Sequence, residues 1–295
     1  MIDMKKPIDV SIIIISYNTK QLLDDCLASV YHSIKRTQTS SEIIVVDNAS
    51  SDGSVAMVKK KYPDVVLIPN RDNVGFGKGN NQGIRIAKGD RILLLNSDTI
   101  VQGSAIEILL ACSKKNPTMF IGPKLFNIDG SPQTSGGPFF TLPVVFAVLF
   151  LKGDKIGLTR QSPDETRLID WVSGACIIAP RSLFLDGLLF DEGIFMYMEE
   201  IDLLMRARGK GYRTLFCHEA HVTHLGSGSS TNRRKGPVLN IYRGFLYLYK
   251  KHYSAVSVIL LRFLLQLKAL LAMGAGILFG NKELKEIYAE AYTLV

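Results

Sequence analysis

The feature that most constrains the fold is a regular alternation of apolar, strand-like runs and helix-like segments in the first part of the chain. Val10–Ser16 (VSIIIIS) is a continuous β-branched run, as expected for a strand that is buried on both faces. Further strand-like runs cover residues 42–47, 65–69 and 91–98, and helix-like segments cover residues 20–33, 54–62 and 76–87. This alternation predicts an α/β fold with a mostly parallel, Rossmann-like sheet that is flanked by helices on both faces.

Polar residues follow directly after three of these strand-like runs. The first run ends in SYN, the second in DNASSDG and the fourth in NSD, with the residues Ser16, Tyr17, Asn18, Asp47, Asn48, Asp52, Asn96, Ser97 and Asp98. Each segment on its own is also a good turn or helix cap. Because ligands of such sheets gather at the carboxyl ends of the strands, the three segments together predict a polar ligand at that edge.

A glycine-rich stretch, Gly75–Gly83 (GFGKGNNQG), superficially resembles a phosphate-binding loop. It follows the third strand-like run rather than the first, and its spacing fits the dinucleotide-binding pattern poorly. The chain also contains no G-x-x-x-x-G-K-[ST] motif. The sequence therefore argues against a Rossmann dinucleotide site and against a nucleotide-hydrolysing P-loop.

Three carboxylates, Glu199, Glu200 and Asp202, lie within four positions of the run Phe195–Arg213. The spacing of the apolar residues predicts a helix over this run, with Gly209 and Gly211 near its end. On that helix Glu199 and Asp202 share a face, and Glu200 lies about 100° away. A purely structural interpretation is open at this point, because acids in a first turn suit the helix dipole and Asp202 can pair with Arg206.

The net charge of +8 is concentrated in the last third of the chain. Between Ala220 and Lys282 there are no acids, and this segment contains the basic residues Arg233, Arg234, Lys235, Arg243, Lys250, Lys251, Arg262, Lys268 and Lys282. A basic segment of this kind favours nucleic acid or an anionic membrane as partner. The aromatic residues of Tyr242–Tyr253 would suit either partner.

The basic segment also contains the apolar run Ser254–Gly280, which is long enough to span a bilayer. Arg262, Gln266 and Lys268 interrupt it, and a charge at the centre of a span costs about 2.5–3.5 kcal/mol. We therefore predict a helix or helix pair that lies in the interface of an anionic membrane, and no nucleic-acid partner. A core helix packed against the main domain is the alternative.

The chain start, MIDMKKPIDV, lacks the apolar core of a signal peptide, and the four cysteines form no C-x-x-C pair. We expect reduced thiols and a protein at the cytoplasmic face of the inner membrane, held there peripherally or monotopically.

The motifs in this order resemble the inverting family 2 glycosyltransferases of the GT-A fold, and among them the rhamnosyltransferase-like enzymes of bacterial surface polysaccharides. The resemblance covers about residues 10–230 and rests on SYN, VVDNASSDGS, NVGFGKGNNQG, LLNSDT, WVSGACIIAPR, FDEGIFMYMEEIDLLMRARGKGYR and HVTHLGSGSS. It implies a GT-A catalytic domain over residues 1–235, with a nucleotide-binding half to about residue 125 and an acceptor half over 126–235. A basic, apolar helical tail, residues 236–295, would then form a membrane-associating extension.

The resemblance also implies where a nucleotide-sugar binds. Residues at donor-binding positions are Ser16, Tyr17, Asn18, Asp47, Asn48, Asp52, Asn73, Gly75, Phe76, Asn80, Asn96, Ser97 and Asp98. Asp47 is expected to hydrogen-bond the base. Asp98 would hold Mg²⁺ or Mn²⁺ against the diphosphate, and His224 matches a position that often supplies a further ligand. Asn96 replaces the first Asp of the D-x-D motif, which leaves this metal one carboxylate short.

On the acceptor side the resemblance makes Glu200 the general base, which takes the proton of the attacking hydroxyl. Glu199 would orient the acceptor, and Asp202 would support the helix. Trp171, Gly174, Ala175 and Asp202 are expected on this side, where Trp171 either stacks on a sugar or belongs to the core.

The implied function is metal-dependent transfer of a sugar, with inversion, to a lipid-linked or polysaccharide acceptor in bacterial cell-surface glycan synthesis. L-Rhamnose from dTDP-L-rhamnose is the candidate donor sugar. A UDP-hexose or UDP-galactofuranose donor is the close alternative, and a nucleotidyltransferase would share the same sheet. A non-catalytic basic module that binds nucleic acid or membrane is the alternative from another class.

Overall fold

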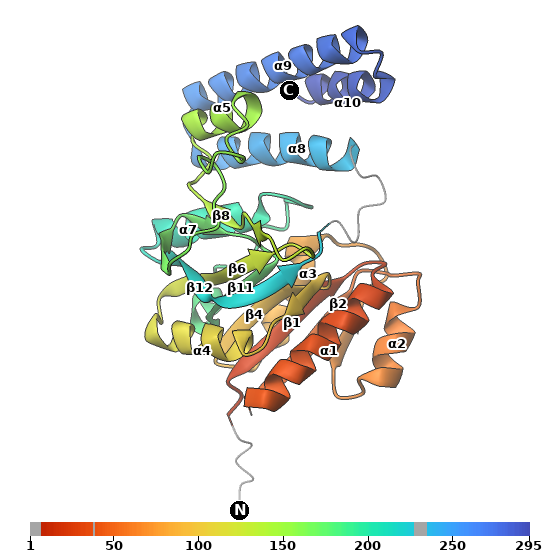
Figure 1. Ribbon diagram of the computed structural model, residues 1–295, viewed down its shortest axis with the longest axis vertical. Coiled ribbons are helices and arrows are strands. Elements are labelled where there is room, and N and C mark those ends of the chain that lie inside the picture. Colours follow the sequence, from red (N-terminus) through yellow and green to blue (C-terminus); the bar gives the residue numbers. More distant parts are fainter. Residues whose placement is uncertain (1–6, 38, 227–234) are drawn as a thin grey trace, which may run out of the picture.

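The computed structural model describes residues 7–37, 39–226 and 235–295, and in it a sheet with flanking helices lies beneath a layer of C-terminal helices (Figure 1). The basic residues Arg233 and Arg234 and the motif residues 227–230 lie outside the described residues, as does the chain start.

The alternation predicted for the first part of the chain is confirmed. The elements in order are β1 (Val10–Ser16), α1 (Lys20–Thr37), β2 (Ser41–Asp47), α2 (Ser54–Lys61), β3 (Val66–Pro69), α3 (Phe76–Ile86) and β4 (Arg91–Asn96). Strands β1, β2, β3 and β4 pair in parallel, with β1 between β2 and β4. Their carboxyl ends, where the polar segments follow, therefore meet at one edge of the sheet.

The next part of the chain completes the sheet and adds small elements. These are β5 (Thr99–Val101), α4 (Ala105–Lys115), β6 (Met119–Phe126), β7 (Pro132–Gln133), β8 (Gly136–Gly137), α5 (Leu142–Phe150), β9 (Arg167–Ile169), β10 (Trp171–Val172), β11 (Cys176–Pro180), α6 (Arg181–Leu185), α7 (Glu199–Gly209) and β12 (Arg213–His224). The main strand order is β3-β2-β1-β4-β11-β6-β12-β5. Strands β11 and β5 run against the other six, so the sheet is mixed and mostly parallel.

The sheet is buried on both faces, as the continuous apolar run of β1 predicts. Ile13 and Ile15 pack in a core with α3, α7 and α8, whereas Ile12 and Ile14 pack in a second core with α1, α2 and α4. Successive side chains of a strand point to opposite faces, which explains why adjacent isoleucines enter different cores.

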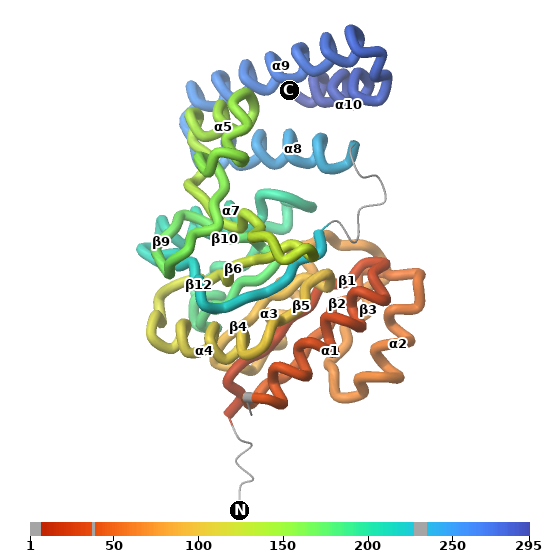
Figure 2. Tube along the Cα trace, viewed as in Figure 1, coloured from red at the N-terminus to blue at the C-terminus, as the bar shows by residue number. Residues whose placement is uncertain are grey.

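Three helices follow the sheet-bearing part: α8 (Lys235–His252), α9 (Ala255–Leu278) and α10 (Lys282–Thr293). Helix α8 lies directly above the sheet-bearing part, and α9 and α10 lie side by side beyond it, with α5 beside α9 (Figures 1 and 2). Phe245, Leu248 and Tyr249 of α8 are fully buried, and the Tyr249 hydroxyl donates to the Phe140 carbonyl at 2.9 Å. Helix α8 is therefore a core helix, and the predicted domain boundary near residue 235 is crossed by a continuous core.

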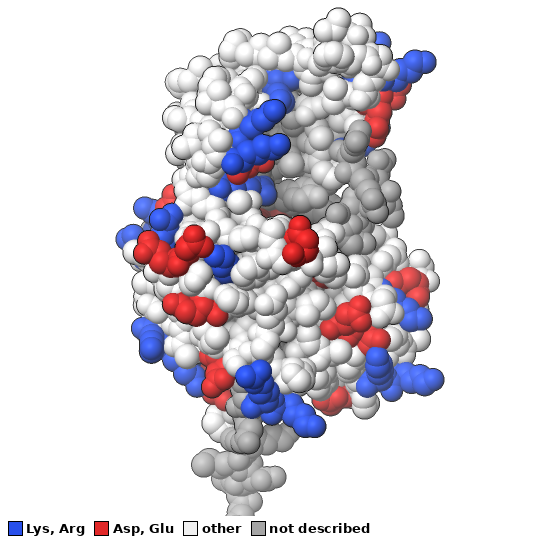
Figure 3. All heavy atoms as spheres, viewed as in Figure 1, with Lys and Arg blue, Asp and Glu red and all other residues white. Residues whose placement is uncertain are grey.

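Helix α9 is different, because most of its apolar side chains are exposed. These are Val256, Ile259, Leu260, Phe263, Leu270, Leu271, Ile277 and Leu278. By length and composition alone, α9 is the one helix within the described ranges that could cross a membrane, and only 17% of its apolar window is buried. The top of the molecule over α9 is accordingly mostly free of charged side chains in Figure 3, with Lys and Arg side chains below it.

The charges that interrupt the apolar run of α9 have partners within the helical layer. Arg262 donates from Nε to the Val295 carbonyl oxygen at 2.7 Å. Lys268 Nζ lies 5.9 Å from the centroid of the Phe150 ring in α5. These two contacts direct the cations towards α10 and α5.

The helix predicted over Phe195–Arg213 is shorter than expected, because α7 begins only at Glu199. Tyr197 and Met198 have left-handed backbone conformations, with φ of 68° and 74°, which no helix can continue through. Met198 therefore precedes the helix, and Glu199 and Glu200 occupy its first turn. The predicted stop is confirmed, since the helix ends at Gly209 and Gly211 has a φ of 89°.

Candidate active site

A chain of hydroxyl groups joins the carboxyl ends of β1 and β4. Ser16 Oγ lies 3.0 Å from Thr19 Oγ1, which lies 2.9 Å from Ser97 Oγ. The predicted residues Ser16 and Ser97 are thus brought together through Thr19, which no motif in the sequence had singled out. All three side chains are buried, so these linked hydroxyl groups hold the ends of β1 and β4 together at the base of the site.

The turn after β2 has one carboxylate oxygen without a partner. Asp47 Oδ1 accepts a hydrogen bond from the Ser50 N–H at 2.8 Å, whereas the buried Asp47 Oδ2 has no partner among the described residues. A buried, unpaired carboxylate oxygen is costly, and a ligand's N–H donor would satisfy it. This suits the predicted contact between Asp47 and a nucleotide base.

Asn18 and Asp52 shape the turns around this edge of the sheet. Asn18 has a φ of 52°, and its side-chain Oδ1 accepts from the Ser51 N–H at 2.8 Å. Asp52 accepts from the Lys20 N–H at 2.7 Å and from the Ser54 N–H at 3.0 Å, so both of its oxygens are used at the starts of α1 and α2. Ligand contact by Tyr17, Asn18 and Asp52 stays a prediction.

The glycine-rich stretch packs against the segment that precedes α7. A Cβ on Gly75, which has a φ of 84°, would lie 2.8 Å from the Phe195 carbonyl oxygen, so only glycine fits there. Asn48 Nδ2 donates to the Gly75 carbonyl at 3.2 Å, and Asn73 Oδ1 accepts from the Gly75 N–H at 3.0 Å. These contacts bring the predicted residues after β2 and β3 together.

The first turn of α3 adds a further unpaired oxygen. The Phe76 N–H donates to the Phe195 carbonyl at 3.2 Å, and Asn80 Nδ2 donates to the Phe76 carbonyl at 3.1 Å. Asn80 Oδ1 is buried without a partner among the described residues, as is Asn96 Oδ1 at the end of β4. These two amide oxygens and Asp47 Oδ2 are the unpaired acceptors at predicted donor-binding positions.

Asp98 and His224, the predicted metal ligands, lie next to each other. His224 Nε2 is 3.3 Å from Asp98 Oδ1, and His224 Nδ1 is 2.8 Å from Gln133 Oε1. Gln133 Nε2 donates to the Asn127 side chain and to the His224 carbonyl, which leaves Gln133 Oε1 to accept from a proton on His224 Nδ1. In the neutral imidazole, the lone pair of Nε2 then points at a carboxylate oxygen.

Such a pair of lone-pair-bearing atoms fits a cation between or beside them. Within the described ranges there is no group of three or more His, Cys, Asp or Glu side chains that could hold a metal ion. One carboxylate and one imidazole nevertheless suit Mg²⁺ or Mn²⁺, which can retain several waters and take its remaining ligands from substrate phosphates. His221, the neighbouring histidine, packs its ring against Phe126 instead.

Glu200 lies beside Gly174 and near the end of β4. A Cβ on Gly174 would lie 3.7 Å from the Glu200 Cβ and 3.6 Å from the Phe76 ring. The next residue, Ala175, accepts a backbone hydrogen bond from the Asn96 N–H at 3.0 Å. Gly174 and Ala175 therefore lie between the predicted base and the Asn96–Ser97–Asp98 segment. Gly174 has no side chain to occupy the space between Glu200 and Phe76.

The two glutamates at the start of α7 have different surroundings. Burial raises the pKa of the Glu199 carboxyl well above its usual range, and the Glu200 charge adds to this rise. Glu199 is 6% exposed, and its Oε2 atom has no partner among the described residues. Burial also raises the pKa of Glu200, but backbone hydrogen bonds and the positive charge of Arg160 oppose the rise. Both pKa values are therefore raised, and only Glu200 has a nearby positive charge and backbone hydrogen bonds that favour its ionised form.

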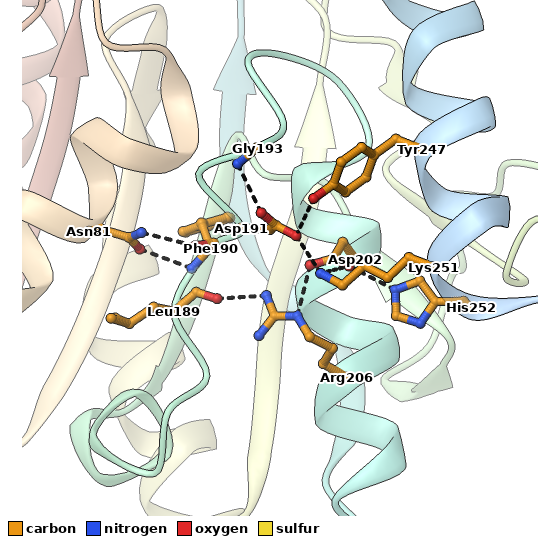
Figure 4. Close-up of polar contacts among 10 residues, drawn as sticks. All are labelled: Asn81, Leu189, Phe190, Asp191, Gly193, Asp202, Arg206, Tyr247, Lys251 and His252. Carbon is orange, nitrogen blue, oxygen red and sulfur yellow. Dashed lines mark hydrogen bonds and ion pairs between the residues drawn. The ribbon is translucent and has the colours of Figure 1, made fainter.

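Behind α7, Asp202 joins this helix to α8 (Figure 4). Its fully buried carboxylate lies 2.8 Å from Arg206 Nε, 2.8 Å from Lys251 Nζ and 2.7 Å from His252 Nε2. Burial raises the pKa of Asp202, but the hydrogen bonds from His252 and Lys251 and the Arg206 charge outweigh it and lower the pKa to about 2. The predicted pair with Arg206 is confirmed, and Asp202 supports the helix from the side of α8.

Lys251 also holds the loop that leads into α7. Its Nζ lies 2.5 Å from Asp191 Oδ2, which in turn accepts from the Tyr247 hydroxyl at 2.9 Å (Figure 4). Farther along α8, a Cβ on Gly244 would lie 2.8 Å from Met198 Cγ. Helix α8 therefore contacts both ends of the loop that precedes Glu199, at Asp191 and at Met198. The sequence of α8 did not indicate this role.

Of the two roles left open for Trp171, stacking on a sugar or packing in the core, its burial favours the core role. The indole is 3% exposed, its N–H donates to the Pro138 carbonyl at 2.9 Å, and its ring stacks on Phe140. Arg160 lies over the same ring, with its guanidinium carbon 5.7 Å from the centroid. Sequence reasoning missed Arg160, because nothing in its local sequence connects it to Trp171 or Glu200.

Comparison with known proteins agrees with this geometry. The model of the family described as glycosyl transferase family 2 matches residues 11–165. The chain belongs to glycosyl transferase family 2. Among its relatives, N-acetylglucosaminyl-diphospho-decaprenol L-rhamnosyltransferase of Mycobacterium tuberculosis is 27% identical over 81% of this chain and 82% of its own. The low-salt glycan biosynthesis hexosyltransferase Agl10 of Haloferax volcanii is 27% identical over 73% of this chain and 67% of its own.

Solved structures share the fold of this family 2 member. TarS residues 1–349 of S. aureus superpose with a TM-score of 0.56 at 17% identity, over 88% of this chain and 70% of that chain. GalNAc-T7 with UDP, GalNAc and Mn²⁺ gives a TM-score of 0.57 at 16% identity, over 82% of this chain and 50% of that chain. The predicted GT-A fold is confirmed, and the protein is a glycosyltransferase.

Proposed function

We propose that this glycosyltransferase moves a sugar from a nucleoside diphosphate to a lipid-linked glycan with inversion at the anomeric carbon. The observation that carries the proposal is the position of Glu200, which lies beside Gly174 while the adjoining Ala175 is hydrogen-bonded to Asn96 at the donor-binding edge. A base that lies this close to the donor-binding edge can take the proton of an acceptor hydroxyl while that hydroxyl attacks the donor sugar. The base-specific role of Glu200 rather than Glu199 is supported by its smaller burial and by the nearby Arg160 charge.

In the proposed reaction, the ionised Glu200 carboxylate accepts the proton of the acceptor hydroxyl as the oxygen attacks the anomeric carbon. The new bond between that oxygen and the anomeric carbon forms as the bond to the diphosphate oxygen breaks, and the electron pair leaves with the nucleoside diphosphate. Asp98 and His224 would hold a divalent metal, which would supply positive charge against the departing diphosphate. The raised pKa of Glu199 disfavours a second negative charge beside the base.

The proposed donor and acceptor are based on the name of one relative, which matches 81% of this chain. Because the name of that relative specifies L-rhamnosyl transfer to a lipid diphosphate, we propose dTDP-L-rhamnose as the first donor to test and a lipid-linked sugar as acceptor. A UDP-hexose is the second choice, since other relatives include hexosyl- and glucosyltransferases. We further propose cell-surface glycan synthesis at the cytoplasmic face of an anionic membrane, which the exposed apolar side chains of α9 and the nearby cations support.

The test is nucleoside diphosphate release by the full chain in detergent from a panel of donors that includes dTDP-L-rhamnose and UDP-hexoses. Each donor is incubated with Mg²⁺, Mn²⁺ or EDTA, with and without a bacterial membrane lipid extract. We expect metal-dependent release from one donor that the extract increases and that Glu200→Gln abolishes. Release that is unchanged in the E200Q variant would rule out the proposed base, and release that is equal in EDTA would rule out the metal.

A further inference from the structure

A polar groove of about 570 Å³ is lined in part by Arg160, and no ligand has been assigned to it so far. Its cationic residues are Lys155, Arg160 and Arg167, and its acidic residues are Asp154, Asp164 and Glu165. Asp164 is already paired with Lys124 at 2.6 Å, and Arg167 donates to the Gln161 side chain. Arg160 stands out, because its guanidinium has no hydrogen bond or ion pair with any residue of the described ranges.

Backbone hydrogen bonds link the segment that carries Arg160 to the segment beside Glu200. The Gln161 carbonyl accepts from the N–H groups of Ser135 and Gly136, and the Gln161 N–H donates to the Gly136 carbonyl at 2.7 Å. Ser135 in turn accepts from the Ser173 N–H at 2.7 Å, and Ser173 precedes the Gly174 that contacts Glu200. The positive charge of Arg160 is near enough to help lower the pKa of Glu200 against its burial.

The Trp171 ring holds the Arg160 side chain without using its donors. A guanidinium over an aromatic face is attracted electrostatically, and it keeps five N–H groups in a fixed fork. A fork of this geometry matches phosphate oxygens, to which it can donate two parallel hydrogen bonds. An oriented, exposed and unpaired arginine therefore favours a phosphate-bearing ligand at this end of the groove.

Exposed apolar residues adjoin the groove residues in the sequence. Ile156 and Leu158 alternate along the chain with the groove residues Lys155 and Gly157, and they are 63% and 53% exposed. Phe146 and Leu151, in and directly after α5, are also exposed, and α5 packs against α9. The segment that carries Ile156 and Leu158 is tied to α5, because the Gly153 N–H donates to the Ala147 carbonyl at 2.9 Å. The same stretch of chain therefore carries Arg160 and the exposed apolar residues that follow α5.

We propose that Arg160 binds the diphosphate of the lipid-linked acceptor, and that the lipid chain leaves across Ile156 and Leu158 towards α5 and α9. This inference rests on the proposed function. It adds that the enzyme recognises its acceptor by the diphosphate as well as by the sugar. An acceptor sugar between Arg160 and Glu200 would have its diphosphate on one side and its reacting hydroxyl on the other.

The experiment compares two acceptors with the same sugar and the same lipid: N-acetylglucosaminyl farnesyl diphosphate, and the phosphate-free N-acetylglucosaminyl farnesyl glycoside. For Arg160→Gln we expect the KM of the diphosphate acceptor to rise about 10-fold or more, which is typical of a lost charge-assisted pair. The KM of the glycoside and the KM of the donor should stay within about twofold. Arg167→Gln, in the same groove, is the matched control and should change none of these constants, and Arg160→Lys should restore part of the loss.

A second measurement does not depend on turnover. Binding of farnesyl diphosphate to the full chain in detergent should weaken about 10-fold in the R160Q variant, while binding of the nucleoside diphosphate stays unchanged. Equal loss for both acceptors, weaker binding of the nucleoside diphosphate, or unchanged binding of farnesyl diphosphate would each overturn the proposal. Failure of the proposed function has a different signature, namely a wild-type chain that releases no nucleoside diphosphate from any donor.

Discussion

Replacement of Gly244 by alanine tests whether α8 positions the catalytic loop. Gly244 lies where α8 crosses Tyr197 and Met198, the two residues with left-handed backbone that precede Glu199. An alanine Cβ there would be 2.8 Å from Met198 Cγ and 3.1 Å from the Tyr197 carbonyl oxygen. Ordinary van der Waals contact begins at 3.4 Å, so Met198 Cγ must move by about 0.6 Å (3.4 − 2.8) and the Tyr197 carbonyl oxygen by about 0.3 Å (3.4 − 3.1).

Two opposing effects decide the stability of G244A. Alanine is favoured over glycine in a helix by about 1 kcal/mol, whereas overpacking of a closely packed contact costs about 1–3 kcal/mol. We expect a net loss of about 0–2 kcal/mol of unfolding free energy. Because a displacement of about 1 Å at reacting groups can reduce the rate about 100-fold, a shift of 0.6 Å next to Glu199 and Glu200 should lower kcat roughly tenfold.

The matched control is Gly274→Ala in α9, where nothing lies within 4 Å of an added Cβ. It has the same gain in helix propensity without the contact, so we expect up to about 1 kcal/mol of added stability and unchanged kcat. Denaturant unfolding gives both free energies, and nucleoside diphosphate release at saturating donor and acceptor gives kcat. If G244A matched G274A in stability and in kcat, α8 would not position the loop.

Three further predictions concern the carboxylates and the metal pair. Because the pKa of Glu199 is raised, its carboxyl destabilises the fold increasingly as the pH rises above about 4.5. Glu199→Gln should therefore raise the thermal midpoint of unfolding at pH 8 but not at pH 4. An equal rise at both pH values would contradict this prediction. The contribution of Asp202 to the free energy of unfolding has the opposite sign. Its pKa is lowered to about 2, so the carboxylate stabilises the fold above pH 4 by about 2 kcal/mol, and this stabilisation is lost as the pH falls through 2. Acid titration of unfolding should show that loss in the wild type and a smaller one in Asp202→Asn, so identical profiles would refute it. For the metal, His224→Ala should raise the Mn²⁺ concentration for half-maximal activity by at least about tenfold, with His221→Ala as control; no difference between the two variants would remove His224 from the site.

The sequence by itself determined the secondary structure of the first part of the chain and the edge of the sheet at which the site forms. Strand and helix periodicity is a local property, so the buried run of β1 and the helices that follow it could be read directly. The polar residues after β1, β2 and β4 had to meet, because the carboxyl ends of adjacent parallel strands share one edge.

Only the tertiary structure decided which side chains meet across long separations. It placed His224 beside Asp98, buried Trp171 against Phe140, and set Arg160 over the same indole. It also began α7 at Glu199, because α8 and the glycine-rich segment hold the left-handed residues before it. Periodicity contains no information on such contacts, since they depend on the packing of elements far apart in the chain. For the same reason the basic tail could be recognised as apolar and cationic, but its division into a buried α8 and an exposed α9 could not.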